Sequence, residues 1–312
     1  MKVFITKRIP EEGIQRMRDN GLVVTVREAD SIIPDDELRT ALTEYDGIVS
    51  MLSDNLSADI LQSATRTRII ANYAVGTNNI DIKEATRLGI MVTNTPDVLT
   101  EATAELAMAL LLSASRRIVP ADRFTRTGKF TGWGPLLFMG KGLDGCTVGI
   151  VGMGRIGQAF ARMAAAFNTR IIYHSRREID VPYPSVDFDT LLRESDVISL
   201  HLPLTPESQG MFNRETFDKM KDGVVFVNTS RGPIVDESAL VNALTSGKIA
   251  FAGLDVYQYE PKITDALKLL YNVVLLPHIG SATIKSRGDM ACLVADNILE
   301  VLNGRPAITP VN

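Results

Sequence analysis

Short runs of β-branched and other apolar residues alternate with helical patterns along most of the chain. In the first hundred residues the apolar runs are VFIT, LVVTV, GIVSM, RIIANYA and IMVTN, and segments such as PDDELRTALTE and DIKEATRLG separate them. After residue 146 the same order returns with TVGIVGMG, RIIYHS, DVISLHLP, GVVFVNTS, IAFAGLDV and NVVLLPHIG. Alternation of this kind predicts parallel sheets with helices on both faces. The sequence therefore predicts an α/β protein with two doubly wound parallel sheets.

Two sheets in 312 residues predict two domains of ordinary size. The two series of strands are separated by a long helical pattern at roughly 100–118 and by an irregular, glycine-rich stretch at 119–146. A closing helical pattern at about 282–303 returns the chain to the first domain. We therefore expect a first domain made of residues 1–98 and 283–312, and a second domain made of residues 99–282.

Composition excludes several classes of protein. The net charge of −4 gives no basic surface for a nucleic acid. The two cysteines, Cys146 and Cys292, form no disulfide framework or metal site and are expected to be buried free thiols. The longest apolar stretch, at 106–114, is too short to cross a bilayer, and the first residues do not resemble a signal peptide. We expect a soluble cytoplasmic protein without a metal.

A glycine motif follows the first strand of the second series. In VGIVGMGRIGQAF, Gly152, Gly154 and Gly157 have the spacing G-x-G-x-x-G directly after an apolar run and at the start of a helical pattern. The first glycine permits a tight turn, the second lets a pyrophosphate approach the backbone, and the third allows close packing of helix and strand. The N-terminus of the helix favours the phosphates. This context predicts a dinucleotide site.

The end of the next strand indicates which dinucleotide is preferred. An NAD enzyme usually has Asp or Glu there to bind the ribose 2′-hydroxyl, but this sequence has Ser175, followed by Arg176 and Arg177. A hydroxyl and two guanidinium groups suit a 2′-phosphate, whereas a carboxylate would repel it. The alternative is a solvated arginine pair on a loop. NADP(H) is favoured, and NAD(H) remains an alternative.

Three residues suited to proton and hydride chemistry follow buried strands of the second series: Arg231, Glu260 and His278. Ligands of open parallel sheets bind outside the carboxyl ends of the strands, where all three are expected to lie. Arginine suits a carboxylate and a neighbouring keto oxygen, and histidine exchanges protons near neutral pH. A glutamate beside the histidine would orient it and favour its protonated form. Taken singly, each has a plain alternative: an ion-pair partner, a turn residue before a proline, or a strand cap.

The chain resembles the D-isomer-specific 2-hydroxyacid dehydrogenase family over essentially its whole length. The resemblance lies in the glycine motif and in HLPLTPES, VNTSRGPIVDE, AGLDVYQYEP and LPHIGSAT, which occur in the order typical of the family. MLSD, PDVLTEATAELA and GWGPLLFMGKGL are most similar to the glyoxylate/hydroxypyruvate reductase branch. This implies a flavodoxin-like substrate domain and a Rossmann dinucleotide-binding domain.

The resemblance also implies roles for individual residues. His278 would be the general acid/base, Glu260 its partner and Arg231 the substrate anchor, and Asp255 would hold the nicotinamide carboxamide. Further cofactor-binding positions would be Arg155, Ile156, Leu202, Pro203, Thr229 and Gly280. Substrate-binding positions besides Arg231 and His278 would be Leu52, Val75, Gly76 and Ser281. A glycine turn such as AVGTNN exposes N–H groups suited to an anion, although a plain connecting turn is the alternative.

The resemblance further implies a homodimer whose arm, residues 119–146, crosses a two-fold axis. Trp133 would then reach the substrate pocket of the partner subunit, or it would only anchor the dimer. We expect an NADPH-dependent reductase of glyoxylate, hydroxypyruvate and similar small 2-keto acids, which gives D-2-hydroxy acids. Two alternatives remain: a dinucleotide-sensing, corepressor-like regulatory protein on the same fold, or another D-2-hydroxyacid dehydrogenase that uses NAD.

Overall fold

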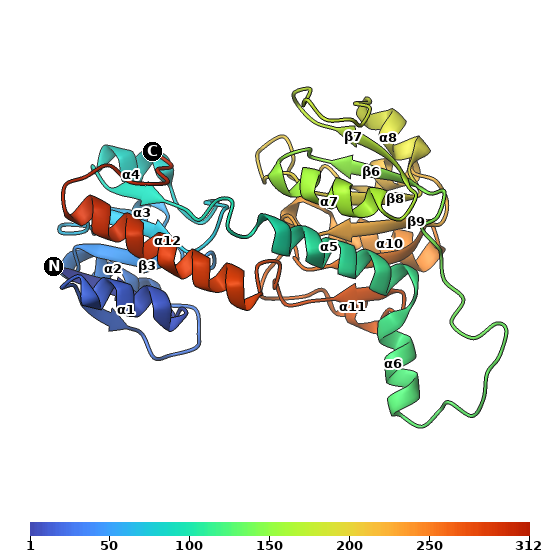
Figure 1. Cartoon of the computed structure of the whole chain (residues 1–312), viewed down its shortest axis with the longest axis horizontal. Coiled ribbons are helices and arrows are strands. Elements are labelled where there is room, and N and C mark those ends of the chain that lie inside the picture. The colour runs from blue at the N-terminus through green and yellow to red at the C-terminus, as the bar shows by residue number, and fades with distance from the viewer. The chain divides into compact units, whose positions relative to one another are not determined.

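The computed structural model describes residues 1–312 and divides into two compact units. Unit 1 contains residues 1–99 and 281–312, and unit 2 contains residues 100–280. Figure 1 shows that each unit is a sheet with helices on both faces. No helix is both long enough and apolar enough to span a membrane.

Unit 1 is built on a five-stranded parallel sheet with the order β2-β1-β3-β4-β5. Its strands are β1 (Lys2–Ile5), β2 (Val23–Val26), β3 (Gly47–Ser50), β4 (Ile69–Asn72) and β5 (Met91–Thr93). Its helices are α1 (Glu11–Asp19), α2 (Asp35–Glu44), α3 (Ala58–Leu61), α4 (Ile82–Arg87) and α12 (Ile284–Leu302). This strand order is that of flavodoxin-like folds. Helices α1 and α12 pack so closely that a Cβ at Gly13 would collide with the Ala291 carbonyl group.

Unit 2 is built on a six-stranded parallel sheet with the order β11-β10-β9-β8-β6-β7. Its strands are β6 (Thr147–Val151), β7 (Arg170–His174), β8 (Val197–Leu200), β9 (Val224–Asn228), β10 (Ile249–Leu254) and β11 (Val273–Leu275). Its helices are α5 (Thr100–Ser115), α6 (Ile118–Arg126), α7 (Arg155–Ala165), α8 (Phe188–Glu194), α9 (Arg214–Asp218), η1 (Gly232–Ile234), α10 (Glu237–Ser246) and α11 (Asp265–Leu269). The order reverses beside β6, where ligands bind in doubly wound sheets.

Two hydrophobic clusters stabilise unit 2, one on each face of its sheet. One cluster joins α5 and α7 to the strands through side chains such as Leu111, Phe160 and Val227. The other joins α8, α9 and α10 to the sheet through side chains such as Phe217, Phe226 and Leu240. Because both faces are covered, β6, β8 and β9 are buried along their whole length. The polar residues that follow these three strands therefore lie at the carboxyl edge of the unit 2 sheet.

The structure corrects the expectations for the segment between the two series of strands. The expected long helix at roughly 100–118 is α5, but it ends earlier, at Ser115, because Arg117 has a left-handed backbone with φ +55°. The stretch 119–146 is not irregular throughout, since α6 continues to Arg126 and its Pro120 lies in the first turn, where proline is tolerated. Both cysteines are free but only half-buried.

Candidate active site

His278 and Glu260 form a hydrogen-bonded pair at the carboxyl edge of unit 2. The Nδ1 atom of His278 lies 2.9 Å from Oε2 of Glu260, and Oε1 of Glu260 accepts a 2.9 Å hydrogen bond from the Tyr257 N–H. His278 follows β11 with φ +54°, a left-handed conformation that few non-glycine residues adopt. The next residue, Ile279, donates its N–H to Asp255 Oδ1 at 2.8 Å. Nδ1 of His278 is thus engaged, which leaves Nε2 to contact a ligand.

The charge state of Glu260 reflects this environment. Burial alone raises the pKa of the Glu260 carboxyl. The hydrogen bond and charge of His278, the Tyr257 N–H and the charge of Arg231 outweigh burial, so the pKa lies below its ordinary value. Glu260 is therefore an anion at neutral pH, placed to orient the His278 ring through its hydrogen bond.

Arg231 lies at the same edge, just after β9. Its Nη1 donates to the Ser230 carbonyl at 2.7 Å, and its own carbonyl accepts from Asn228 Nδ2 at 3.1 Å. Burial lowers the pKa of the guanidinium and the charge of Glu260 opposes this effect, yet arginine stays cationic in proteins. No acidic side chain pairs with Arg231 at hydrogen-bond distance, which does not fit the surface ion-pair alternative. This half-buried cation can bind an anionic ligand.

The glycine motif forms a tight turn between β6 and α7. Gly152 has φ +99°, and a Cβ there would lie 2.5 Å from the His201 carbonyl oxygen. A Cβ at Gly157 would collide with the Gly152 carbonyl oxygen, so both positions need glycine. A Cβ at Gly154 would meet open space, which leaves the backbone at the N-terminus of α7 accessible to a phosphate. Arg155 and Ile156 form the first turn of α7.

Three buried polar atoms near these strand ends lack partners, namely His201 Nδ1, Thr229 Oγ1 and Asp255 Oδ2. Buried polar groups are nearly always hydrogen-bonded, so these atoms are suited to form hydrogen bonds with a ligand. Burial raises the pKa of Asp255, while the Ile279 N–H and the charge of His278 oppose it. A Cβ at Gly280 would lie 3.4 Å from Asp255 Oδ2, an ordinary van der Waals contact. The glycine turn and these orphaned atoms fit a dinucleotide that ends in a carboxamide.

The edge beyond β7 carries the residues expected to select the cofactor. Ser175 is half-buried directly after the strand, and Arg176 and Arg177 are exposed without ion pairs. Glu207, which is hydrogen-bonded to Thr205, is close enough to Arg176 for that charge to lower its pKa. Leu202 packs against the core after β8, and the Pro203 carbonyl accepts from Ser208 Oγ at 2.8 Å. No carboxylate occupies the strand end itself.

The expected substrate residues Leu52, Val75 and Gly76 lie at the carboxyl edge of the unit 1 sheet. The carbonyls of Val75 and Gly76 accept hydrogen bonds from Asn94 Nδ2 and Asn72 Nδ2 at 2.8 and 2.9 Å. Within unit 1, no hydrogen bond uses the N–H of either residue. The turn is therefore fixed through its carbonyls and presents two free donors, which suits an anion. Ser281 begins the segment that returns to unit 1.

The structure adds polar residues that the sequence did not single out. His201 is half-buried and packs against Phe160, with ring centroids 4.9 Å apart, and burial of its ring lowers its pKa to about 3. Asp54 and Glu237 are carboxylates only 2% and 3% exposed. Only the general signal of a polar residue after an apolar run could have suggested them, and many turns share that signal.

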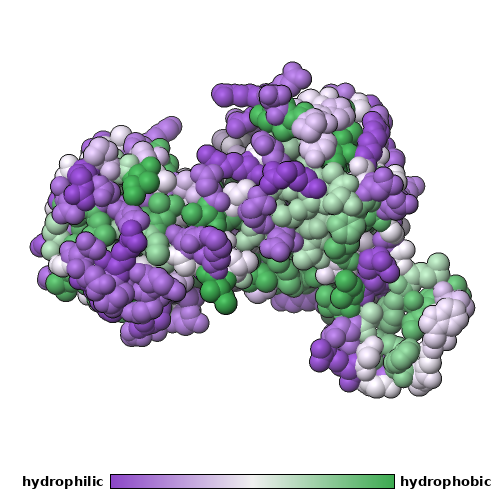
Figure 2. Space-filling view, viewed as in Figure 1, coloured by the Kyte–Doolittle hydropathy of each residue, from purple (hydrophilic) through white to green (hydrophobic).

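The arm leaves an unusually apolar surface on unit 2. Figure 1 shows α6 and the following loop extending away from the rest of the unit, and Figure 2 shows hydrophobic residues on this extension. Trp133 is 84% exposed, and no residue of α6 is buried. A groove of about 610 Å³ beside α6 is lined by side chains that include Phe124, Phe138 and Leu270. Apolar exposure on this scale is typical of an interaction surface.

Comparisons with known proteins agree with this geometry. Residues 108–280 match the family D-isomer specific 2-hydroxyacid dehydrogenase, NAD binding domain. The chain is 49% identical to a glyoxylate reductase of Thermococcus litoralis, over 97% of this chain and 94% of that protein. The TT0316 protein of Thermus thermophilus has a TM-score of 0.96 and 43% identity, with each chain fully covered.

A third relative was solved with a cofactor. It is an NADPH-dependent glyoxylate/hydroxypyruvate reductase of Sinorhizobium meliloti in complex with NADP and malonate, with a TM-score of 0.88 and 32% identity over 99% of this chain and 96% of that one. Identity at this level over full length exceeds what a shared fold alone requires. The chain therefore belongs to the D-isomer specific 2-hydroxyacid dehydrogenases, a family of NAD(P)-dependent oxidoreductases.

Proposed function

We propose that this protein reduces glyoxylate, hydroxypyruvate and similar small 2-keto acids to D-2-hydroxy acids with NADPH. The observation that carries this proposal is the hydrogen-bonded pair of His278 and Glu260 on the same edge as the unpaired cation Arg231. Relatives that are named glyoxylate reductases support the choice of substrate.

Ketone reduction needs a proton for the developing alkoxide and a positive group for the substrate anion. His278 donates the proton from Nε2, because Nδ1 is held by the Glu260 carboxylate. Arg231 binds the carboxylate and keto oxygen with its planar fork. The turn glycines, Thr229 and Asp255 hold the dinucleotide, which supplies the hydride when bound. The free N–H groups of Val75 and Gly76 in unit 1 are suited to bind a carboxylate.

A steady-state assay tests this proposal most simply. Consumption of NADPH is followed with glyoxylate and with hydroxypyruvate, and NADPH binding is measured separately by calorimetry. We expect turnover with both acids. NADPH binding without turnover of any small 2-keto acid would contradict the proposal and favour a dinucleotide-sensing regulatory protein.

We propose that Ser175, Arg176 and Arg177 favour NADPH over NADH, because they offer a hydroxyl and two cations where a carboxylate would repel a 2′-phosphate. The triple variant Ser175→Asp, Arg176→Gln, Arg177→Gln should prefer NADH in kcat/KM. Arg193→Gln, another exposed arginine of unit 2, is the control and should leave the preference unchanged. A wild-type protein that already prefers NADH would refute this assignment.

We propose a homodimer in which a second copy of this chain covers the arm. The apolar side chains on α6, at Trp133 and along the neighbouring groove cannot form a core by themselves, and self-association is the common way to bury such a surface. Trp133 of the partner subunit limits the size of the substrate.

Trp133→Ala separates a role in the pocket from simple anchoring. If Trp133 limits substrate size, light scattering still detects a dimer while kcat/KM shifts towards bulkier keto acids. Dissociation at low concentration with an unchanged substrate ranking would show that Trp133 only anchors the dimer.

A further inference from the structure

Glu237, a buried carboxylate outside the proposed catalytic set, contacts the loop that carries Glu260. It begins helix α10 and is 3% exposed. Its Oε1 accepts a 2.6 Å hydrogen bond from the Gln258 N–H, and its Oε2 accepts from the Thr264 hydroxyl. In return, the Glu237 N–H donates to Gln258 Oε1 at 3.1 Å. All of these partners are neutral groups of one loop.

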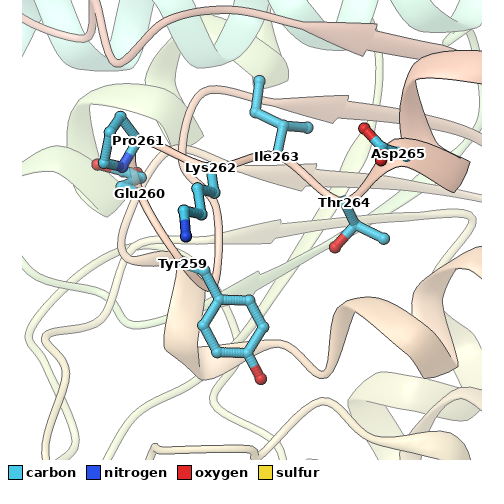
Figure 3. A pocket seen from close by; sticks show the side chains of 7 residues that line it. All are labelled: Tyr259, Glu260, Pro261, Lys262, Ile263, Thr264 and Asp265. Carbon is cyan, nitrogen blue, oxygen red and sulfur yellow. The ribbon is translucent and has the colours of Figure 1, made fainter.

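The two loop residues that Glu237 contacts lie on either side of Glu260 in the sequence. Gln258 precedes it and Thr264 follows it, so Glu237 fixes both arms of the loop. Figure 3 shows the loop itself, with Glu260 and Thr264 on opposite sides of a pocket that residues 259–265 line. Between these two fixed points, the Glu260 carboxylate contacts the Tyr257 N–H and His278 Nδ1. The position of Glu260 therefore depends on the anchors at Gln258 and Thr264.

The segment that ends at Glu237 also contains Arg231. Between them, Gly232 packs against the same loop so closely that a Cβ there would collide with the Tyr257 carbonyl group. The connection from β9 to α10 thus carries Arg231 at one end and holds the Glu260 loop at the other. Loss of the Glu237 carboxylate would remove the acceptor of two half-buried donors and release this loop.

We propose that Glu237 is a positioning residue, which holds Glu260 against His278 without contacting substrate or cofactor. This inference rests on the proposed function, because it assigns a role to the loop that serves the acid/base pair. Small misplacements of catalytic groups slow a reaction strongly, and a shift of roughly 1 Å can lower the rate by about 100-fold.

Three variants test the proposal. Glu237→Ala removes both acceptors and should lower kcat by about 10- to 100-fold, with unchanged NADPH affinity and with activity lost at a lower pH than in the wild type. Glu237→Gln keeps a carbonyl for the Gln258 N–H and an amide for the Thr264 hydroxyl, so it should retain most activity. Ser195→Ala is the control, because Ser195 is equally buried in unit 2 and its hydroxyl bonds only to the Leu191 carbonyl.

An NMR titration of the imidazole groups provides a readout that needs no turnover. The chain has three histidines, so the His278 signal is assigned from His278→Gln. Glu237→Ala should displace the His278 titration in the same direction as Glu260→Gln does, and Thr264→Val, which removes one donor, should displace it less. A wild-type titration curve in Glu237→Ala would overturn the proposal. The proposal would also be overturned if Glu237→Ala lost no more kcat than Ser195→Ala when the two variants have the same thermal stability.

The two readouts also separate this proposal from the proposed function. A wild-type protein without keto-acid reduction would refute the proposed function, whereas the titration would still report whether Glu237 holds the pair together. If Glu237→Ala does not fold, Glu237→Gln and Thr264→Val decide by the same two measurements.

Discussion

The two units place carboxylates at equivalent edges of similar sheets, yet their chemistry differs. In unit 1, Asp54 is 2% exposed, and its Oδ2 accepts from the Thr6 hydroxyl at 2.5 Å and the Met51 N–H at 2.7 Å. Burial raises the pKa of Asp54, and these hydrogen bonds and the charges of Arg27 and Lys7 oppose it only in part. In unit 2, the charged neighbours of Glu260 reverse the effect of burial and lower its pKa.

The difference shows that position at a strand end does not determine the role of an acid. Asp54 contacts only neutral donors and fixes the turn that begins at Met51, next to a network in which Asn79 Nδ2 donates to the Met51 carbonyl at 3.0 Å. Glu260 contacts an ionisable ring and lies near a cation. We infer that the acid in unit 1 maintains a binding loop, and that the acid in unit 2 controls a proton.

The largest expected effect is that of removing the proton donor. His278→Gln keeps a polar side chain of similar reach but cannot act as a general acid near neutral pH, so kcat should fall by about 10²- to 10⁴-fold. NADPH binding, measured by calorimetry, should be unchanged. A near-normal kcat would contradict the role of His278.

A smaller effect is expected when the partner of the histidine is neutralised. In Glu260→Gln the imidazolium form loses its adjacent negative charge, so kcat should fall by about tenfold or more and activity should be lost at a lower pH. A pH–activity profile measured beside the wild type checks this. An unchanged profile would remove Glu260 from the mechanism.

The smallest effect is expected from Asp54→Asn, and it should concern stability. Because its folded-state pKa is raised above 3.8, Asp54 contributes stability at low pH that is lost as the pH rises through the raised pKa. Glu260 behaves oppositely, since its lowered pKa gives stability above 4.5 that is lost as the pH falls through the folded value.

Calorimetric unfolding of both variants at several pH values measures these contributions. The stability difference between wild type and variant should grow with pH for Glu260→Gln and shrink with pH for Asp54→Asn. Each contribution should be about 1 kcal/mol. If the stability difference between wild type and variant changed with pH in the same direction for both variants, the contrast between the two acids would be contradicted.

The sequence predicted the parts of the molecule that depend on local pattern. Apolar runs indicated both sheets, and the spacing of Gly152, Gly154 and Gly157 indicated the turn before α7. The contacts of buried acids could not be predicted in this way, because Thr6 lies 48 residues from Asp54 and Gln258 lies 21 residues from Glu237. Such pairs become visible only when the strand order is known.

The arm shows a second limit of pattern. Its glycines indicated irregular backbone, and Pro120 within the pattern resembled a helix break, so α6 was not predicted beyond residue 118 although its residues are amphipathic.

The pH dependence of hydride transfer in His278→Gln tests the central claim most directly. The rate is measured in single turnovers with NADPH and glyoxylate, beside the wild type. The wild-type rate should fall as the pH rises and the proton donor is lost, whereas the slow rate of His278→Gln should not depend on pH over the same range. A variant that keeps the wild-type decline would show that another group donates the proton.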